Sequence, residues 1–342
     1  MNLYPLIRPV LFQLDPEFAH DLSLKALSIA ASCGFFPESA QNFNDRPTRA
    51  MGLSFPNPVG LAAGLDKNGD YIDALAALGF GFLEVGTVTP RAQPGNPKPR
   101  LFRNPQAQAI INRMGFNNRG VDYLAERLKH CRYSGILGVN IGKNFDTPIE
   151  KAQDDYRICM RKLYFRASYI TVNVSSPNTK NLRSLQQTGL LKNLLQLLRA
   201  DRAVLRDQHG KIVPLAVKIA PDLNDDEIVQ LAQLFLDTGI DALIATNTTL
   251  VRNRIRGTRD ADQEGGLSGK PLFDRSTEVV AKFASLFKNR IPIIASGGIM
   301  APEDALKKIA AGATLVQLYS GLVYSGPDLV AKTVSAFRQG SF

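Results

Sequence analysis

Two stretches near the end of the chain, IPIIASGG at residues 291–298 and LVQLYSG at residues 315–321, decide the fold. Each is a short, mainly apolar run that ends in serine and glycine, as expected for a strand buried on both faces of a parallel sheet. Between them, Pro302 opens a segment with acidic residues in its first turn, and Gly312 follows that segment. These residues are typical of the beginning and end of a helix, so the sequence here predicts a strand–helix–strand unit.

The same pattern recurs from residue 47 onward and gives eight predicted strands. They are residues 58–64, 82–89, 137–143, 169–175, 214–220, 242–248, 291–298 and 315–321. One connecting helix is especially well marked, because Asn224 and three acidic residues open it and Gly239 follows it. Eight such units predict an α/β fold, a TIM (β/α)8 barrel over residues 47–342. A doubly wound open sheet is the alternative, but no Gly-x-Gly-x-x-Gly motif follows the first strand.

Residues 1–46 are predicted to form an N-terminal two-helix extension. The first helix has apolar residues at helical spacing: Leu3, Ile7, Val10, Leu11 and Leu14. The second begins with Asp15 as cap and Pro16 in the first turn, and it ends near Gly34. Two short amphipathic helices cannot form a core alone. They are therefore expected either to cover the barrel or to lie in a membrane interface.

The composition argues against several classes of protein. Three cysteines, Cys33, Cys131 and Cys159, are too few for a disulfide scaffold and indicate reduced thiols in a cytoplasmic compartment. Three histidines are too few for a histidine metal site or a Ser-His-Asp triad. The net charge is +10, but the basic residues are scattered and lack an aromatic–basic motif. An anionic ligand together with an anionic membrane surface accounts for this charge at least as well as nucleic acid does.

The active site is predicted at the carboxyl ends of the strands, where TIM barrels hold their active sites. The residues there are mostly amides and hydroxyls, with Lys67 and Lys218 and scarcely a carboxylate. Such a set favours a planar, carbonyl-rich, anionic ligand and does not favour a metal. Glycines after the last two strands, at 296–298 and 320–321, predict a phosphate site, although they are also compatible with tight strand ends.

Several residues have more than one interpretation from sequence alone. Each lysine is compatible with a Schiff base, an anion partner or a solvated surface position. Ser176, before Pro177, fits either a site or a turn, and residues 112–118 fit either a substrate loop or a Gly-Asn turn cluster. The arginines between 252 and 259 are expected to lie in a solvated loop.

Four motifs in this order resemble the dihydroorotate dehydrogenase family over essentially the whole chain. They are GLAAGLDK at 60–67, NRMGFN at 112–117, NVSSPNT at 173–179 and SGGI at 296–299. The soluble class of that family has a cysteine in the loop after strand four, whereas this chain has Ser176. Together with the N-terminal extension, this serine makes the chain resemble class 2, the membrane-associated, quinone-reducing class.

The resemblance implies an FMN-dependent oxidation of dihydroorotate to orotate, the fourth step of pyrimidine synthesis. Ser176 would take the proton and flavin N5 the hydride, and Lys218 would stabilise the anionic reduced ring. A membrane quinone would then take the electrons. The protein would be peripheral on the cytoplasmic side of the cell inner membrane, held there through residues 1–46. No metal and no nucleic acid is expected.

The resemblance also assigns residues to each ligand. FMN would be held by Ala63, Gly64, Lys67, Thr87, Asn140, Asn173, Lys218, Thr246, Ser268, Gly269, Gly298, Tyr319 and Ser320. The substrate would be held by Lys67, Asn112, Arg113, Met114, Gly115, Phe116, Asn173, Asn178, Asn247 and Thr248. His20 and Arg103 are the candidates at a quinone channel between the two N-terminal helices. Two other hypotheses are a lyase or isomerase with a Schiff base on Lys218, and a membrane-bound adaptor without enzymatic activity.

Overall fold

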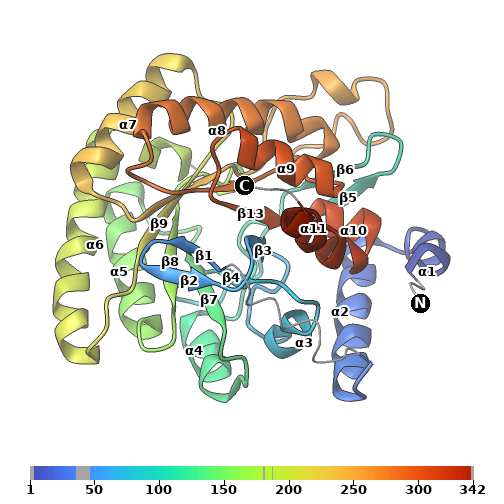
Figure 1. The fold of residues 1–342 in the computed structure, drawn as a ribbon, viewed down its shortest axis with the longest axis horizontal. Helices are drawn as coiled ribbons and strands as arrows, with labels where there is room; N and C mark the ends of the chain where they lie inside the picture. Colours follow the sequence, from blue (N-terminus) through green and yellow to red (C-terminus); the bar gives the residue numbers. More distant parts are fainter. Residues whose placement is uncertain (1–3, 36–46, 180–181, 187, 340–342) are drawn as a thin grey trace.

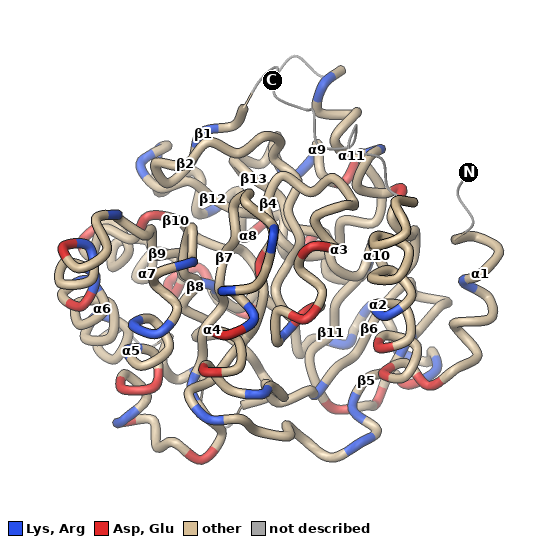
Figure 2. Tube along the Cα trace, turned by 90° about the horizontal axis from the view of Figure 1, so that it is seen from below, with Lys and Arg blue, Asp and Glu red and all other residues tan. Residues whose placement is uncertain are grey.

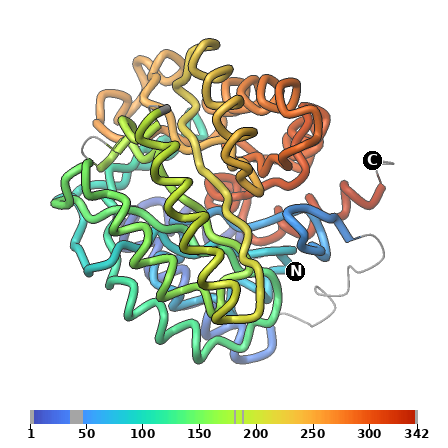
Figure 3. The backbone as a smooth tube through the Cα atoms, turned by 90° about the vertical axis from the view of Figure 1, so that its left-hand side faces the viewer, coloured from blue at the N-terminus to red at the C-terminus, as the bar shows by residue number. Residues whose placement is uncertain are grey.

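Eight parallel strands close into a barrel with helices around it (Figures 1 and 3). The computed structural model describes residues 4–35, 47–179, 182–186 and 188–339. The barrel strands are β3 (Val59–Leu61), β4 (Phe82–Val88), β7 (Ile136–Ile141), β8 (Tyr169–Asn173), β9 (Leu215–Ile219), β10 (Ala242–Ala245), β12 (Ile293–Ser296) and β13 (Leu315–Leu318). All eight predicted strands and the predicted TIM barrel are confirmed. Each predicted range runs past its strand at the carboxyl end, because the polar residues there leave the ladder and form loops.

The connecting helices cover the outside of the barrel. They are α3 (Ile72–Ala76), α4 (Val121–His130), α5 (Ala152–Leu163), α6 (Thr188–His209), α7 (Asp225–Thr238), α8 (Phe273–Phe287), α9 (Pro302–Ala310), α10 (Ser320–Ser325) and α11 (Asp328–Gln339). Short 3-10 turns lie at η2 (Ile149–Lys151), η3 (Leu182–Gln186), η4 (Asn253–Ile255) and η5 (Lys270–Leu272). The predicted ends of α7 are confirmed: Asn224 and Glu227 form a capping box, and Gly239 adopts the left-handed conformation.

The predicted N-terminal helices are also present, as α1 (Tyr4–Leu11) and α2 (Pro16–Ser32). The Asp15 carboxylate accepts hydrogen bonds from the backbone N–H groups of Glu17 and Phe18, at 3.0 and 2.9 Å. Helix α2 packs against α3 and α1 against α10, at one side of the barrel (Figure 1). Residues 1–3 and 36–46, which complete the predicted extension, lie outside the described residues. Among the described helices, none is long and apolar enough to cross a membrane.

A second sheet, not predicted from sequence, lies beside the barrel. It contains β5 (Leu101–Asn104), β6 (Ala109–Asn112) and β11 (Gly266–Gly269), all antiparallel in the order β11-β6-β5. The sheet joins two long loops, one after β4 and one after β10, and its register pairs Asn112 with Gly266. This pairing brings the Asn112 and Ser268 segments to the rim of the barrel.

A hairpin of β1 (Thr48–Ala50) and β2 (Leu53–Phe55) covers the amino ends of the barrel strands. Its two-residue turn has φ values of 54° at Met51 and 74° at Gly52, as a type I′ turn requires. Phe55 is fully buried and meets the Phe82 ring edge to face, with centroids 5.1 Å apart. A Cβ at Gly60 would lie 2.2 Å from the Phe82 ring, so only glycine leaves room for this ring.

Candidate active site

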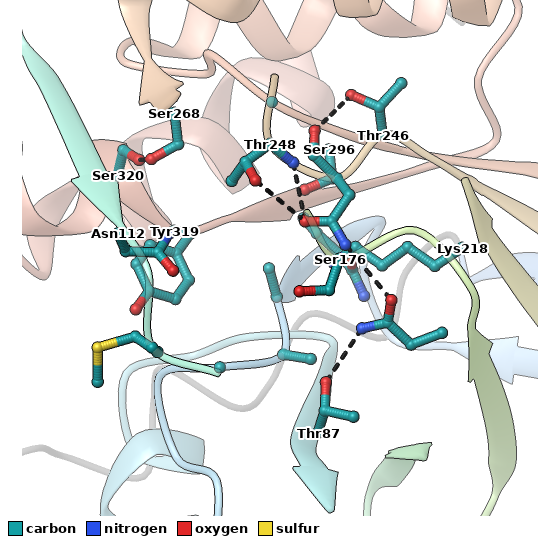
Figure 4. Close-up of a pocket in the computed structure, with 18 of the residues that line it drawn as sticks. Thr87, Asn112, Ser176, Lys218, Thr246, Thr248, Ser268, Ser296, Tyr319 and Ser320 are labelled. Carbon is teal, nitrogen blue, oxygen red and sulfur yellow. Dashed lines mark hydrogen bonds between the residues drawn. The ribbon is translucent and has the colours of Figure 1, made fainter. Parts of the chain in front are cut away.

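A pocket opens at the carboxyl ends of the barrel strands (Figure 4). It brings together most of the predicted site residues: Ala63, Gly64, Lys67, Thr87, Asn112, Met114, Gly115, Phe116, Asn173, Ser176, Asn178, Lys218, Thr246, Asn247, Thr248, Ser268, Gly298, Tyr319 and Ser320. Residues from distant parts of the chain therefore surround one cavity, with Ser176 and Lys218 on the same pocket.

Three of the residues predicted to hold FMN or the substrate do not line the pocket. Asn140 lies behind it, where its Oδ1 accepts a hydrogen bond of 3.1 Å from Asn173. Arg113 turns outward, with its guanidinium 4.7 Å above the Phe102 ring. Gly269 lies next to Ser268, and a Cβ there would lie 2.2 Å from the backbone oxygen of Gln108. These residues shape the wall and its supports rather than the cavity surface.

A chain of side-chain hydrogen bonds fixes the amides at the base of the pocket. Thr87 Oγ1 donates to Asn140 Oδ1 at 2.6 Å and accepts from Asn173 Nδ2 at 3.0 Å. Asn140 Nδ2 in turn donates to the buried carboxylate of Glu84 at 2.8 Å. Glu84 also accepts from Tyr169 at 2.9 Å and from Gln317 at 2.7 Å. Since each partner orients the next, the network holds the pocket amides in one orientation before any ligand binds.

The predicted substrate residues are joined in the same way. Asn178 Nδ2 donates to the backbone oxygen of Asn112 at 3.0 Å, which links the loop after β8 to the second sheet. Asn247 Nδ2 donates to Ser175 Oγ at 3.1 Å, and its Oδ1 accepts from the Thr248 N–H at 2.8 Å. These bonds hold three loops around one cavity, and this arrangement suits a small planar ligand with several carbonyl and N–H groups.

The loop that carries Ser176 is held in place by an arginine. Ser176 is buried, with 6% of its surface exposed. The Arg183 guanidinium donates to the backbone oxygens of Ser175 at 3.2 Å and Thr248 at 3.0 Å. It also pairs with the Asp222 carboxylate at 2.9 Å. One side chain therefore ties the Ser176 loop to the loop after β10.

Both lysines face the pocket, which removes the solvated-surface interpretation. Burial, followed by the nearby Arg100 guanidinium, lowers the pKa of Lys67 to about 8, against the opposing effect of Glu17. Burial also lowers the pKa of Lys218, and the Glu84 carboxylate partly opposes this. The site therefore offers two cations whose charge responds readily to a bound anion.

The glycines after β12 form a close approach to α8. Gly297 and Gly298 have φ values of 119° and 77°, a region that favours glycine. A Cβ at Gly298 would lie 2.4 Å from the Phe273 Cα, so a side chain cannot be placed there without moving backbone. The hydroxyls of Ser268 and Ser320, which also line the pocket, are 2.9 Å apart (Figure 4). Backbone N–H groups of glycines and hydroxyls that line a pocket wall suit a phosphate.

Gln317, which is not among the predicted site residues, lies inside β13 and lines the pocket. Its Oε1 is buried without a hydrogen-bond partner among the described residues. An unsatisfied acceptor at a pocket wall indicates a ligand with an N–H donor, because burial without a partner is unfavourable. A glutamine within an apolar strand was the available signal. Ala62, Leu272 and Ile299 also line the pocket and carried no such signal.

The arginines between 252 and 259 only partly fit the predicted solvated loop. Arg254, Arg256 and Arg259 are exposed as expected. Arg252 is half-buried and donates to the backbone oxygens of Thr249, at 3.2 Å, and Gly265. The prediction was therefore wrong for Arg252, which braces the loop after β10.

A second, apolar cavity lies between the N-terminal helices and the barrel. Among its lining residues are Phe12, His20, Leu24, Arg103, Leu322 and Tyr319. Burial lowers the pKa of His20 to about 4, so its ring is neutral at physiological pH. Arg103 donates to the Leu11 backbone oxygen at 2.8 Å and lies 4.7 Å above the Phe12 ring. Tyr319 lines both cavities, so its ring separates them.

Comparisons with known proteins agree with one another. The family model described as dihydroorotate dehydrogenase matches residues 47–339. A relative from Azotobacter vinelandii, named dihydroorotate dehydrogenase (quinone), is 57% identical over 334 residues, 98% of this chain and 96% of its own length. A relative of the same name from Methylococcus capsulatus is 59% identical over 327 residues, 96% of either chain. The ligand-free DHODH structure from Eimeria tenella aligns with a TM-score of 0.86 at 41% identity, covering 94% of each chain.

Proposed function

The chain belongs to the dihydroorotate dehydrogenase family, and we propose that it oxidises dihydroorotate to orotate with a quinone as electron acceptor, a step of pyrimidine biosynthesis. The single observation that carries this proposal is the pocket itself. It combines a buried serine, a ring of oriented amides and a lysine with a lowered pKa. Neither a Schiff-base lyase nor an adaptor without activity accounts for the family membership.

FMN is the proposed cofactor of this flavin-dependent family. The glycine pair at 297–298 and the hydroxyls of Ser268 and Ser320 suit its phosphate, and Gln317 Oε1 suits an N–H of its ring. Lys218, at the base of the pocket, would offset the negative charge of the reduced ring. Bound FMN would supply the acceptor for the hydride.

The substrate would lie against the amides that the loops bring together. The Lys67 ammonium would pair with its carboxylate, and Asn112, Asn178 and Asn247 would hydrogen-bond its ring. Binding of the carboxylate would raise the pKa of Lys67 and keep this side chain charged.

Ser176 would accept the proton from the carbon next to a carbonyl of the substrate. A serine hydroxyl is a weak base in water, so the low exposure of Ser176 and its fixed loop support the role. Arg183 would hold the loop in the position that the proton transfer needs.

The second cavity is proposed as the quinone site. Its apolar lining and the neutral His20 suit a hydrophobic ring with carbonyl groups, and Arg103 would hydrogen-bond one of these groups. Because the Tyr319 ring borders both cavities, the two redox partners would lie on opposite sides of a thin wall.

Peripheral membrane binding through α1 and α2 is proposed as well, on the cytoplasmic side of the inner membrane. Helix α1 lies at the edge of the molecule, away from the barrel (Figures 1 and 2). Four apolar side chains of the two helices are largely exposed: Leu6 at 74%, Val10 at 60%, Phe18 at 57% and Ile29 at 65%. Exposed apolar residues of this density mark an interaction surface, and two amphipathic helices suit a lipid interface.

The proposal is tested with the purified holoenzyme and the variant Ser176→Ala. The wild type should carry FMN, and dihydroorotate should bleach its absorbance in the absence of air. Ser176→Ala should still bind FMN, but its flavin reduction should slow by about 10²-fold or more, because a general base contributes on that order. Fast reduction in Ser176→Ala would overturn the role of the serine. A colourless protein that does not take up FMN would overturn the proposed cofactor.

A further inference from the structure

Lys308 is a fully buried cation on α9, with 0% of its surface exposed. Its Nζ donates to Ser276 Oγ at 2.6 Å and to the Phe273 backbone oxygen at 3.3 Å, and it lies 4.9 Å from the Phe273 ring centroid. All three partners are neutral. A buried ammonium is normally paired with a carboxylate, because losing its hydration is unfavourable.

The nearby carboxylates are engaged elsewhere. Asp274, on α8, pairs with Arg254. Asp304, on α9, accepts hydrogen bonds from the backbone N–H groups of Met300 and Ala301, at 2.9 and 3.1 Å. Burial lowers the pKa of Lys308 to about 7, and the two carboxylates oppose this only in part. Within the described residues, the charge of Lys308 therefore lacks a counter-ion in direct contact.

Ser276 connects this amine to the glycine loop of the pocket. Its hydroxyl accepts from Lys308 and lies 3.0 Å from two carbonyl oxygens, those of Gly297 and Phe273, which share its single proton. In a trans peptide the C=O and the following N–H point in opposite directions. The peptide between Gly297 and Gly298 therefore has its oxygen held on the α8 side by Ser276. Its N–H, on Gly298, is directed to the other side, and both glycines line the pocket.

Lys308 also increases the polarity of that peptide. A hydrogen bond from a cation strengthens the next bond in the chain, so the ammonium, the hydroxyl and the carbonyl act in series. An anion that binds to the Gly298 N–H would at the same time provide the missing counter-charge, without contact with the amine itself.

We propose that Lys308 is a positioning residue for the cofactor phosphate, acting through Ser276 to orient the Gly297–Gly298 peptide and to offset the charge of the phosphate. This inference rests on the proposed FMN cofactor. It predicts selectivity for a flavin that carries a phosphate over one that lacks it. A lysine that merely fills space in the core would affect both flavins alike.

The test is a competition between FMN and riboflavin for the flavin site of the full-length protein. Wild type, Lys308→Met and Lys307→Met are each equilibrated with an equimolar mixture of the two flavins, and the bound flavins are quantified after denaturation. Lys307→Met is the matched control, because Lys307 is exposed on the same helix and lies 5.9 Å from the same Phe273 ring. Lys308→Met should lower the bound FMN-to-riboflavin ratio by about 3- to 10-fold, less than the loss of a direct charge-assisted hydrogen bond, because the ammonium acts through the Ser276 hydroxyl. Lys307→Met should leave the ratio unchanged.

A second variant, Ser276→Ala, keeps the lysine and removes the connection. It should lower the same ratio and accelerate FMN release, followed by the rise in flavin fluorescence. The inference is overturned if a folded Lys308→Met keeps an FMN-to-riboflavin ratio within twofold of the wild type. If Lys308→Met does not fold, the same result in Ser276→Ala overturns it. If the wild type prefers FMN and both variants keep that preference, only the role of Lys308 is refuted. Wild-type protein that shows no preference for FMN refutes the proposed cofactor.

Discussion

Replacement of Glu84 by glutamine tests the hydrogen-bond network under the pocket. Glu84 is fully buried and accepts from Asn140 on one oxygen and from Tyr169 and Gln317 on the other. Glutamine keeps the shape of the side chain but replaces one acceptor oxygen with an NH₂ donor. While Tyr169 and Gln317 keep their present orientations, this donor faces at least one other donor, so at least one hydrogen bond is lost.

The magnitude follows from the bonds that change. One buried donor left without a partner costs about 1–3 kcal/mol, and the remaining bonds weaken by about 1 kcal/mol each when the acceptor loses its charge. Part of this loss is offset because the neutral glutamine no longer requires a charge to be buried. The free energy of unfolding should therefore fall by about 2–4 kcal/mol, and the unfolding temperature by roughly 3–6 °C, because a chain of 342 residues has an unfolding entropy of about 0.7 kcal/mol/K.

The assay is thermal unfolding of the holoenzyme, followed by circular dichroism and by flavin fluorescence. Glu126→Gln is the matched control, because Glu126 is an exposed glutamate on α4 that, within the part of the chain that the structure describes, pairs with Lys129 and His130 of its own helix. That control should unfold at the wild-type temperature. An unchanged unfolding temperature in Glu84→Gln would refute the reasoning, since Tyr169 and Gln317 would then have turned to accept hydrogen bonds from the new amide.

Three further outcomes are expected. The affinity for orotate, measured by the shift in flavin absorbance, should fall as the pH rises through about 8, because the Lys67 side chain is charged below its pKa and neutral above it. Lys67→Met should remove this pH dependence. Arg183→Lys should slow flavin reduction by about tenfold, because lysine lacks the planar guanidinium that joins two loops. The control Arg157→Lys, in the outer Arg157–Asp201 pair, should react at the wild-type rate. Equal rates in the wild type and both variants would exclude a role for Arg183. Removal of residues 1–46 should impair quinone reduction more than flavin reduction by dihydroorotate, and equal losses in the two half-reactions would contradict the proposed quinone cavity.

The barrel could be predicted because its strands are buried on both faces. Each strand is a continuous apolar run, and the polar residues that follow it mark the catalytic end of the barrel. Local signals also sufficed for α7, where Asn224 and Gly239 define both ends. Ser176 and the pocket amides followed from their place after the strands together with a family resemblance.

The remaining features depend on contacts between distant residues. The strands β5, β6 and β11 are four residues each, and residues 109–112 pair with residues 266–269, which no local pattern indicates. Gln317 and Glu84 lie within strands, and only the closed barrel shows that they face the same interior. The sequence left a solvated surface position open for Lys67 and Lys218. The structure excludes it, because the burial of these side chains depends on the packing of neighbouring loops.

The hairpin of β1 and β2 covers the amino ends of the barrel strands, where Phe55 and the ring of Phe82 fill the base of the barrel. The pocket opens at the carboxyl ends of the same strands, so the Met51–Gly52 turn lies at the opposite end of the barrel from it. A fluorescent dye or an affinity handle attached at that turn would therefore report on the protein, or immobilise it, while the pocket stays free to meet its ligands.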